Sequence, residues 1–204
     1  MNNKNEQNNL LEDVSKHVTT LFKENLPDWA VYHNLSHTIN TVNACEEIGK
    51  GIGLSEEDLE ILYISAWFHD TGYLFQSDGH EEISSKLSSN YLNSRNYPKE
   101  KIERVVECIM ATKILKKPNG LLEFVICDAD LISLGGQDYF EKNNQLKIEI
   151  EQREDRKISE LEWLKRSINF LSTHKYFTEY ARQNYSDRLK ANIKYLIEKI
   201  AELQ

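Results

Sequence analysis

Proline, glycine and cysteine are scarce in this sequence of 204 residues, which contains 3 Pro, 8 Gly and 3 Cys. So few turn-forming residues exclude collagen-like and Pro-rich disordered chains, and they argue against a β-rich fold with many tight turns. The cysteines are scattered and form no CxxC pair; they are Cys45, Cys108 and Cys127. We therefore expect reduced thiols and a cytoplasmic location.

An excess of basic residues is also missing, because 25 Lys and Arg stand against 33 Asp and Glu, for a formal net charge of −8. Such a chain lacks the attraction to phosphate that non-specific binding to nucleic acids or anionic membranes requires. The longest near-apolar run, Ile61–Phe68, is far shorter than the roughly 18 residues of a membrane-spanning helix. The polar start MNNKNEQNN has no apolar signal core. We expect neither a nucleic-acid polymer nor a membrane as partner, whereas a small phosphorylated substrate is compatible with a bound metal that supplies positive charge.

Apolar residues recur at helical spacing almost everywhere, and no stretch of five or more residues alternates cleanly at period two. The sequence predicts an all-α fold, with one helical domain over 10–204 and a disordered, Asn-rich tail over 1–9. Gly72 is the expected end of the apolar helix 59–68, Asp78 the expected cap of the next helix, and Pro98 an expected first helical residue. The remaining expected helices cover 10–22, 35–48, 98–110, 121–134, 139–150, 159–171 and 178–203.

Histidine and aspartate stand at the edges of the most apolar helices. His69 and Asp70 follow the apolar helix directly, and Asp130 follows another apolar run. An ionised Asp in apolar surroundings is costly unless it is paired or bound to a cation. Imidazole nitrogen and carboxylate oxygen are both good ligands for first-row metal ions. These positions therefore indicate a metal site.

The ordered set of a single His, a His-Asp pair and a distant Asp resembles the HD superfamily of metal-dependent phosphohydrolases, an all-helical family named for its His-Asp doublet. The resemblance covers about residues 32–135 and implies an HD-domain-like helical bundle. It implies that one divalent metal ion is held by His37, His69, Asp70 and Asp130. Asp130 is preferred to Asp128 because the family's Asp usually follows Ala and shortly precedes Leu, as here. Asp128 is expected to be structural, or to accept a hydrogen bond from a ligand imidazole.

Two local likenesses suggest further site residues. The stretch YHNLSH over 32–37 resembles the YHNxxH motif of class I cyclic-nucleotide phosphodiesterases, a branch of the same superfamily, which implies that His33 is a general acid. The segment from FHDTGY to His80 and Glu81 is closer to small bacterial HD phosphohydrolases, in which such residues line the substrate pocket or position water. Lys113 stands where some branches carry His, which favours one metal ion over two and makes Lys113 a candidate phosphate contact.

These residues also have simpler interpretations. His33 and His80 could be plain helix-start residues, Glu81 a carboxylate favoured by the helix dipole, and Lys113 a solvated surface side chain. An apolar stripe on the last helix could pair two subunits in a homodimer, although such a stripe is more often core. The stripe consists of Leu189, Ile193, Leu196 and Ile200.

The resemblance implies a hydrolase that cleaves a phosphoester or phosphoanhydride bond of a nucleotide or similar small phosphate. Asp70 would bind metal and orient the attacking water, and His33 or His80 would protonate the leaving oxygen. The ligand set suits Mn, Fe, Co, Ni or Zn better than Mg. The alternatives are a cyclic-nucleotide phosphodiesterase and a non-catalytic nucleotide-binding HD domain.

Overall fold

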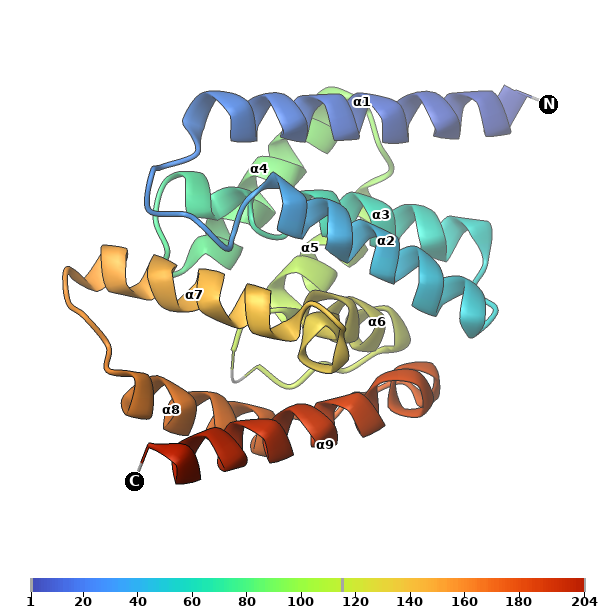
Figure 1. The fold of residues 1–204 in the computed structure, drawn as a ribbon. Helices are drawn as coiled ribbons and strands as arrows, with labels where there is room; N and C mark the ends of the chain where they lie inside the picture. The colour runs from blue at the N-terminus through green and yellow to red at the C-terminus, as the bar shows by residue number, and fades with distance from the viewer. Residues whose placement is uncertain (1, 115, 204) are drawn as a thin grey trace. The chain divides into compact units, whose positions relative to one another are not determined.

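The computed structural model describes residues 2–114 and 116–203, so Met1 of the expected tail lies outside the described residues. In this part of the chain every regular element is a helix, which confirms the predicted all-α class (Figure 1). The α-helices are α1 (Asn2–Asn25), α2 (Leu35–Gly51), α3 (Glu56–Phe68), α4 (His80–Ser94), α5 (Lys99–Ala111), α6 (Leu121–Asp130), α7 (Tyr139–Glu154), α8 (Glu160–Thr173) and α9 (Glu179–Glu202). Two 3-10 helices are η1 (Thr71–Leu74) and η2 (Ile132–Gly135). None of the helices described is both long and apolar enough to cross a membrane.

The chain forms two compact units. Unit 1 comprises the residues up to Pro27 together with His33–Asp130, and unit 2 comprises Asp28–Tyr32 together with the residues from Leu131 onward. The short segment Asp28–Tyr32 therefore belongs to unit 2, although it lies between two helices of unit 1. The expected division into a tail and one domain stays a prediction, and the first helix begins at Asn2, inside the segment expected to be disordered.

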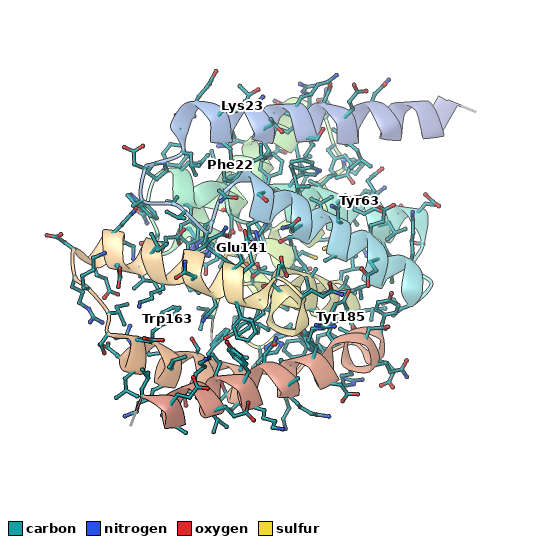
Figure 2. The ribbon with its side chains drawn as sticks, viewed as in Figure 1. Phe22, Lys23, Tyr63, Glu141, Trp163 and Tyr185 are labelled. Atoms are coloured by element: carbon teal, nitrogen blue, oxygen red, sulfur yellow. The ribbon has the colours of Figure 1, made fainter. Side chains whose placement is uncertain are left out.

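Unit 1 is built around α3, which is contacted by α1, α2, α4, α5 and α6. The helix is apolar nearly all round, so it can be surrounded; its side chains Ile61, Ile64 and Phe68 have no exposed area. Amphipathic helices cover it. In α1, Phe22 is 2% exposed whereas the neighbouring Lys23 is exposed to solvent (Figure 2).

Three free cysteines lie in the core of unit 1, where Cys45, Cys108 and Cys127 come from α2, α5 and α6. Burial raises the pKa of all three thiols, and it raises that of Cys108 to about 12. The thiols therefore stay protonated, as expected of small hydrophobic core residues.

The ends of the helices around residues 68–79 differ from the sequence prediction. Helix α3 ends at Phe68, and Gly72 lies instead in η1. A Cβ atom on Gly72 would lie 2.0 Å from the carbonyl oxygen of His80, so this glycine is required by a close approach of η1 to the start of α4. The prediction that Asp78 caps α4 is wrong, since the residue preceding the helix is Gly79 in the left-handed conformation, with φ of 72°.

Two further helix boundaries were mispredicted. Helix α5 begins at Lys99, and Pro98 is the residue before it, with an extended ψ of 131°. The expected helix over 121–134 stops at Asp130, after which the chain continues into η2. In unit 2 a Cβ atom on Gly135 would lie 2.4 Å from the carbonyl oxygen of Tyr185, so η2 also ends at a close approach that only glycine allows.

Unit 2 consists of η2, α7, α8 and α9 with the segment Asp28–Tyr32. Its core includes Trp163 of α8, which Figure 2 labels, and Leu189 and Leu196 of α9. These two leucines belong to the stripe considered for a dimer, and their burial within the chain favours the interpretation as core. The homodimer itself stays a prediction. Glu149 of α7 is fully buried, and one of its carboxylate oxygens accepts a hydrogen bond of 2.8 Å from the Tyr32 backbone N–H.

Candidate metal centre

The predicted ligands come from the ends of three helices of unit 1. His37 lies in the first turn of α2, where the Asn34 side chain caps the helix and accepts hydrogen bonds from the backbone N–H groups of Ser36 and His37. His69 and Asp70 directly follow α3, and Asp130 is the last residue of α6. Helix ends can direct side chains to one point from several directions, which side chains along a single helix cannot do.

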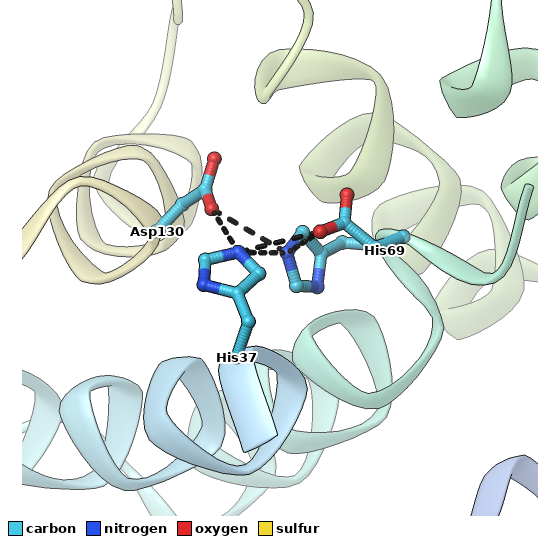
Figure 3. Close-up of side chains that lie close together, drawn as sticks. His37, His69 and Asp130 are labelled. Carbon is cyan, nitrogen blue, oxygen red and sulfur yellow. Dashed lines mark hydrogen bonds and ion pairs between the residues drawn. The ribbon is translucent and has the colours of Figure 1, made fainter. Parts of the chain in front are cut away.

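The four side chains converge on one point (Figure 3). One ligand atom from each lies within 4.8 Å of the others. His37 Nε2 lies 3.0 Å from Asp130 Oδ1 and 3.3 Å from Asp70 Oδ2. His69 Nε2 lies 3.1 Å from Asp70 Oδ2, and the two Nε2 atoms are 3.4 Å apart.

The chemistry of this donor set fits a divalent metal ion. The carbonyl oxygen of Ala66 lies 2.8 Å from His69 Nδ1 and can only accept a hydrogen bond, so Nδ1 carries the proton and Nε2 directs a lone pair into the cluster. Asp70 Oδ2 is buried, and among the described residues it has no hydrogen-bond partner, only the charge contacts to the two imidazoles. Two imidazole nitrogens and two carboxylate oxygens around one point are a typical first-row metal site.

The pKa shifts of the four residues also indicate a site for a cation. Burial lowers the pKa of His37 and His69, but contacts with Asp70 and Asp130 outweigh it and raise both pKa values, that of His69 well above its usual range. Burial raises the pKa of the two carboxyls, but the adjacent imidazoles outweigh it, so the pKa of Asp70 is held well below its ordinary value and that of Asp130 is also lowered. The carboxylates therefore favour positive charge at this point, whether it is a proton or a metal ion.

His80 and Glu81 lie beside the cluster at the start of α4. His80 Nδ1 donates a hydrogen bond of 2.8 Å to the carbonyl oxygen of Ser77, and its Nε2 lies 3.4 Å from Asp70 Oδ1. Burial lowers the pKa of His80, but the contact with Asp70 outweighs it and raises the pKa above its ordinary value. Glu81 is 5% exposed, and its Oε2 lies 3.6 Å from His80 Nδ1.

His33 packs against Tyr73, a residue that the sequence did not indicate as part of the site. The two rings stack, with centroids 3.9 Å apart and an interplanar angle of 8°. The centroid of His33 is also 5.8 Å from that of His37. The sequence did not predict Tyr73 as a site residue, because its position depends on η1. The one indication in the sequence was its place three residues after Asp70 in FHDTGY.

Comparison with protein families matches the HD domain to residues 34–135, which is half of the chain. The chain belongs to the HD domain family. The match contains all four residues of the metal centre and confirms the resemblance seen in the sequence. It begins after His33, and the likeness of residues 32–37 to the YHNxxH motif stays a prediction.

Solved structures share the HD fold over nearly the whole chain. A predicted HD superfamily hydrolase from an uncultured Thermotogales bacterium is 18% identical, with a TM-score of 0.62 over 93% of this chain and 92% of that one. Bacillus subtilis YpgQ, solved in complex with ADP, is 14% identical, with a TM-score of 0.69 over 96% of both chains. These likenesses establish a common fold. A comparison with curated protein sequences gave no match.

Lys113 and Asp128 are the two remaining residues that the sequence analysis considered, and both lie in unit 1. The Lys113 ammonium group forms an ion pair with the Glu82 carboxylate in the first turn of α4, and both side chains are about two-fifths exposed, at 42% and 43%. Its role as a phosphate contact stays a prediction. Asp128 is fully buried two residues before the end of α6, as a structural residue would be.

Proposed function

We propose that this HD protein is a divalent-metal-dependent phosphohydrolase that cleaves a phosphoester or phosphoanhydride bond of a small phosphorylated compound. The observation that carries the proposal is the convergence of His37, His69, Asp70 and Asp130 within 4.8 Å. Membership of the HD family and the fold shared with a predicted HD hydrolase support it. The free, buried thiols also fit a reducing compartment, so we propose that the enzyme works in the cytosol.

Different residues of the chain would hold the cation and move a proton. His37, His69, Asp70 and Asp130 would hold the metal. A divalent cation held there supplies a Lewis acid that polarises a phosphoryl oxygen and makes water more acidic. Asp70 has its second carboxylate oxygen directed to His80, so the two side chains are suited to orient a water molecule bound beside them. His80 and His33 are the candidate donors of a proton to the leaving oxygen.

Nucleotides are the substrate class that we propose first. YpgQ shares the fold of this chain and was solved with ADP, which is a nucleotide with a phosphoanhydride bond. Lys113 lies two residues after the end of α5, and its ion pair with Glu82 is partly exposed and of modest strength. A phosphate group could therefore replace Glu82 as the partner of the Lys113 ammonium group. Together these observations make nucleoside phosphates the first compounds to test.

A chromatographic assay that resolves products tests the proposal. Purified protein with Mn²⁺ is incubated with a mixture of nucleoside triphosphates, diphosphates, monophosphates and cyclic nucleotides, beside Asp70→Ala and the matched control Asp78→Ala. Asp78 is an exposed aspartate of the same segment. We expect Asp70→Ala to lose more than about 100-fold of the activity, since even changes outside the ligand shell cost 10- to 100-fold. Asp78→Ala should match the wild type.

Full activity of metal-free Asp70→Ala would contradict the proposal. Tight binding of a nucleotide by metal-free protein, with no product formed, would contradict it as well and would favour a binding-only HD domain.

A cyclic-nucleotide phosphodiesterase is the second candidate function. The position of His33 favours this candidate, because its ring lies next to that of the proposed ligand His37. A residue that donates a proton to a cyclic ester would need to lie there. In that case the same assay yields a 5′-monophosphate from a cyclic nucleotide, and His33→Ala loses most of the activity. No turnover of any cyclic nucleotide would remove this candidate.

A further inference from the structure

The ring of Tyr73 contacts two histidines of the candidate site. It stacks on His33, at a centroid distance of 3.9 Å and an angle of 8°. It also contacts His80, at 4.1 Å and 40°, and the centroids of the two imidazoles are 6.4 Å apart. Tyr73 is 7% exposed, and all three residues belong to unit 1. The two imidazoles that it contacts are the two candidate proton donors.

We propose that Tyr73 is a positioning residue whose ring, packed against both His33 and His80, fixes the orientation of the two imidazoles beside the metal ligands. This inference rests on the proposed function, because it assigns Tyr73 a role in the same reaction. It adds a residue outside the proposed ligand set, since tyrosine here acts through its neighbours and not through the metal.

The backbone around Tyr73 holds its ring firmly relative to the metal ligands. The Tyr73 N–H donates a hydrogen bond of 3.0 Å to the carbonyl oxygen of Asp70, so η1 continues directly from a ligand. The Gly72 N–H donates to Ser84 Oγ at 2.8 Å, which fastens η1 to α4. Because Gly72 has no Cβ, η1 also lies against the His80 carbonyl. The ring is thus anchored both to Asp70 and to the helix that carries His80.

Packing against an aromatic ring helps to direct an imidazole that donates a proton, and at His80 it adds to the hydrogen bond from Nδ1 to the Ser77 carbonyl oxygen. Rotation about the χ2 angle of histidine is broad, so a ring without lateral packing samples many orientations. Rings of similar size that stack face to face restrict this rotation. Misplacing a reacting group by about 1 Å can cost 100-fold in rate, so loss of the stack should appear in kcat more than in KM.

Four variants of the full-length protein test the role of the ring. Tyr73→Phe keeps the aromatic ring, Tyr73→Leu and Tyr73→Met remove it, and Phe75→Leu is the matched control at an aromatic residue that is 59% exposed. We expect Tyr73→Leu and Tyr73→Met to lower kcat by about 10- to 100-fold, with KM and bound metal per chain unchanged. Tyr73→Phe should restore most of the rate, and the control should equal the wild type.

A structural readout independent of turnover accompanies the kinetics. In NMR spectra of the wild type, with and without added Zn²⁺, the Hε1 resonances of His33 and His80 should be displaced by the ring current of Tyr73. Tyr73→Phe should keep the displacement and Tyr73→Leu should abolish it. Undisplaced resonances in the wild type would overturn the proposal even if the leucine and methionine variants fail to fold.

The kinetic outcomes separate this inference from the proposed function. If Asp70→Ala and His80→Ala lose activity while Tyr73→Leu or Tyr73→Met keeps kcat, the inference fails and the function stands. An equal loss in Tyr73→Phe and Tyr73→Leu would assign the effect to the hydroxyl group and would also overturn the inference. Full activity of metal-free Asp70→Ala would overturn the proposed function, whatever the Tyr73 variants do.

Discussion

At the scale of single residues, protons and a metal ion compete for the same four side chains. His37 and His69 bind metal only when they are neutral, yet Asp70 and Asp130 raise their pKa values above the ordinary 6.5. The carboxylates stay ionised throughout the neutral range, because their own pKa values are lowered. The histidines alone therefore set the pH at which metal is displaced.

Metal affinity should fall as the pH falls, beginning above pH 6.5. In the metal-free protein, His37 and His69 are protonated below their raised pKa values, and the protonated imidazoles compete with metal binding. The protonated form disappears as the pH rises through these pKa values. Competition with a chromophoric chelator, measured between pH 8.5 and pH 6, should show progressively weaker Zn²⁺ binding. Equal affinity across this range would contradict the assignment of His37 and His69 as ligands.

His174, between α8 and α9 in unit 2, should make the protein less stable in mild acid. Burial lowers its pKa to about 4, and its buried Nε2 has no hydrogen-bond partner among the described residues. Because the folded pKa is lowered, protonation favours the unfolded state as the pH falls from the ordinary 6.5 toward 4. Between pH 7 and pH 5 this one group should cost about 2 kcal/mol of unfolding free energy.

Urea titrations at these two pH values measure that cost, and the variant His174→Phe isolates it. Phenylalanine cannot titrate and keeps a ring next to Tyr176, which His174 contacts edge-on at 4.7 Å. We expect the variant to lose about 2 kcal/mol less than the wild type between pH 7 and pH 5. Parallel losses in both proteins would show that other groups dominate.

The positions of charged residues and the family resemblance predicted the candidate metal ligands, but neither indicated Tyr73. His69, Asp70 and Asp130 could be predicted because charged or ligating residues at the ends of apolar helices need a physical reason to be there. Tyr73 carries no such signal. Its contact with two histidines depends on a turn of 3-10 helix whose geometry no periodicity in the sequence indicates.

At the scale of elements, the cap of α2 should affect both stability and metal binding. Asn34 Oδ1 accepts a hydrogen bond from the backbone N–H of His37 at 3.1 Å, so the same side chain caps the start of the helix and holds the backbone of a candidate ligand. Asn34→Ala should lower the unfolding free energy by about 1 kcal/mol. It should also weaken metal retention, measured by metal analysis after dialysis against a chelator.

A cap in unit 2, which contains none of the candidate ligands, supplies the control for this experiment. Ser159 caps α8 in unit 2, where its Oγ accepts from the Glu162 N–H. Ser159→Ala should cost a similar amount of stability and leave metal retention unchanged. An equal loss of metal from both variants would mean that general destabilisation is responsible.

The body of each helix could be predicted, whereas several ends could not. Apolar spacing shows which residues face a core, so α3 and the amphipathic α5 were correctly predicted. The helix ends near Gly72 and Gly135 depend on close backbone contacts, of Gly72 with His80 and of Gly135 with Tyr185. The spacing of apolar residues does not indicate either contact. Because of these tertiary contacts, 3-10 helices stand where the sequence predicted helix ends at glycine.

At the scale of the whole molecule, the limits of the HD match are not the limits of a stable unit. Asp28–Tyr32 belongs to unit 2 and is held there by Glu149, which lies beyond the matched residues 34–135. Asn192 of α9 likewise donates a hydrogen bond to the carbonyl oxygen of Leu134 in η2. Nothing in the spacing of apolar residues indicates that five residues between α1 and α2 should pair with a helix so much later in the chain.

A fragment that ends at residue 135 should therefore be unstable. It leaves the Tyr32 N–H without its buried acceptor and removes the helices that cover η2, and one buried unsatisfied group alone costs about 1–3 kcal/mol. Urea unfolding followed by circular dichroism should show an early, broad transition for the fragment and a cooperative one for the full chain. A fragment as stable as the full chain would contradict this prediction.

Glu149 provides a finer version of the same test within the full chain. Glu149→Gln keeps an acceptor oxygen for the Tyr32 N–H, and Glu149→Leu removes it. We expect the leucine variant to be less stable than the glutamine variant by about 1–3 kcal/mol. Equal stability would mean that the hydrogen bond contributes little.

The three buried cysteines make the native chain a convenient background for chemical labelling. Their raised pKa values and their burial in the core keep thiolate away from solvent, so maleimide reagents should leave the folded protein unmodified and react with three thiols only after denaturation. A cysteine introduced at an exposed position such as Phe75 would then be the single reactive group. A fluorophore attached there would report on changes at the end of η1 without any native cysteine having to be removed.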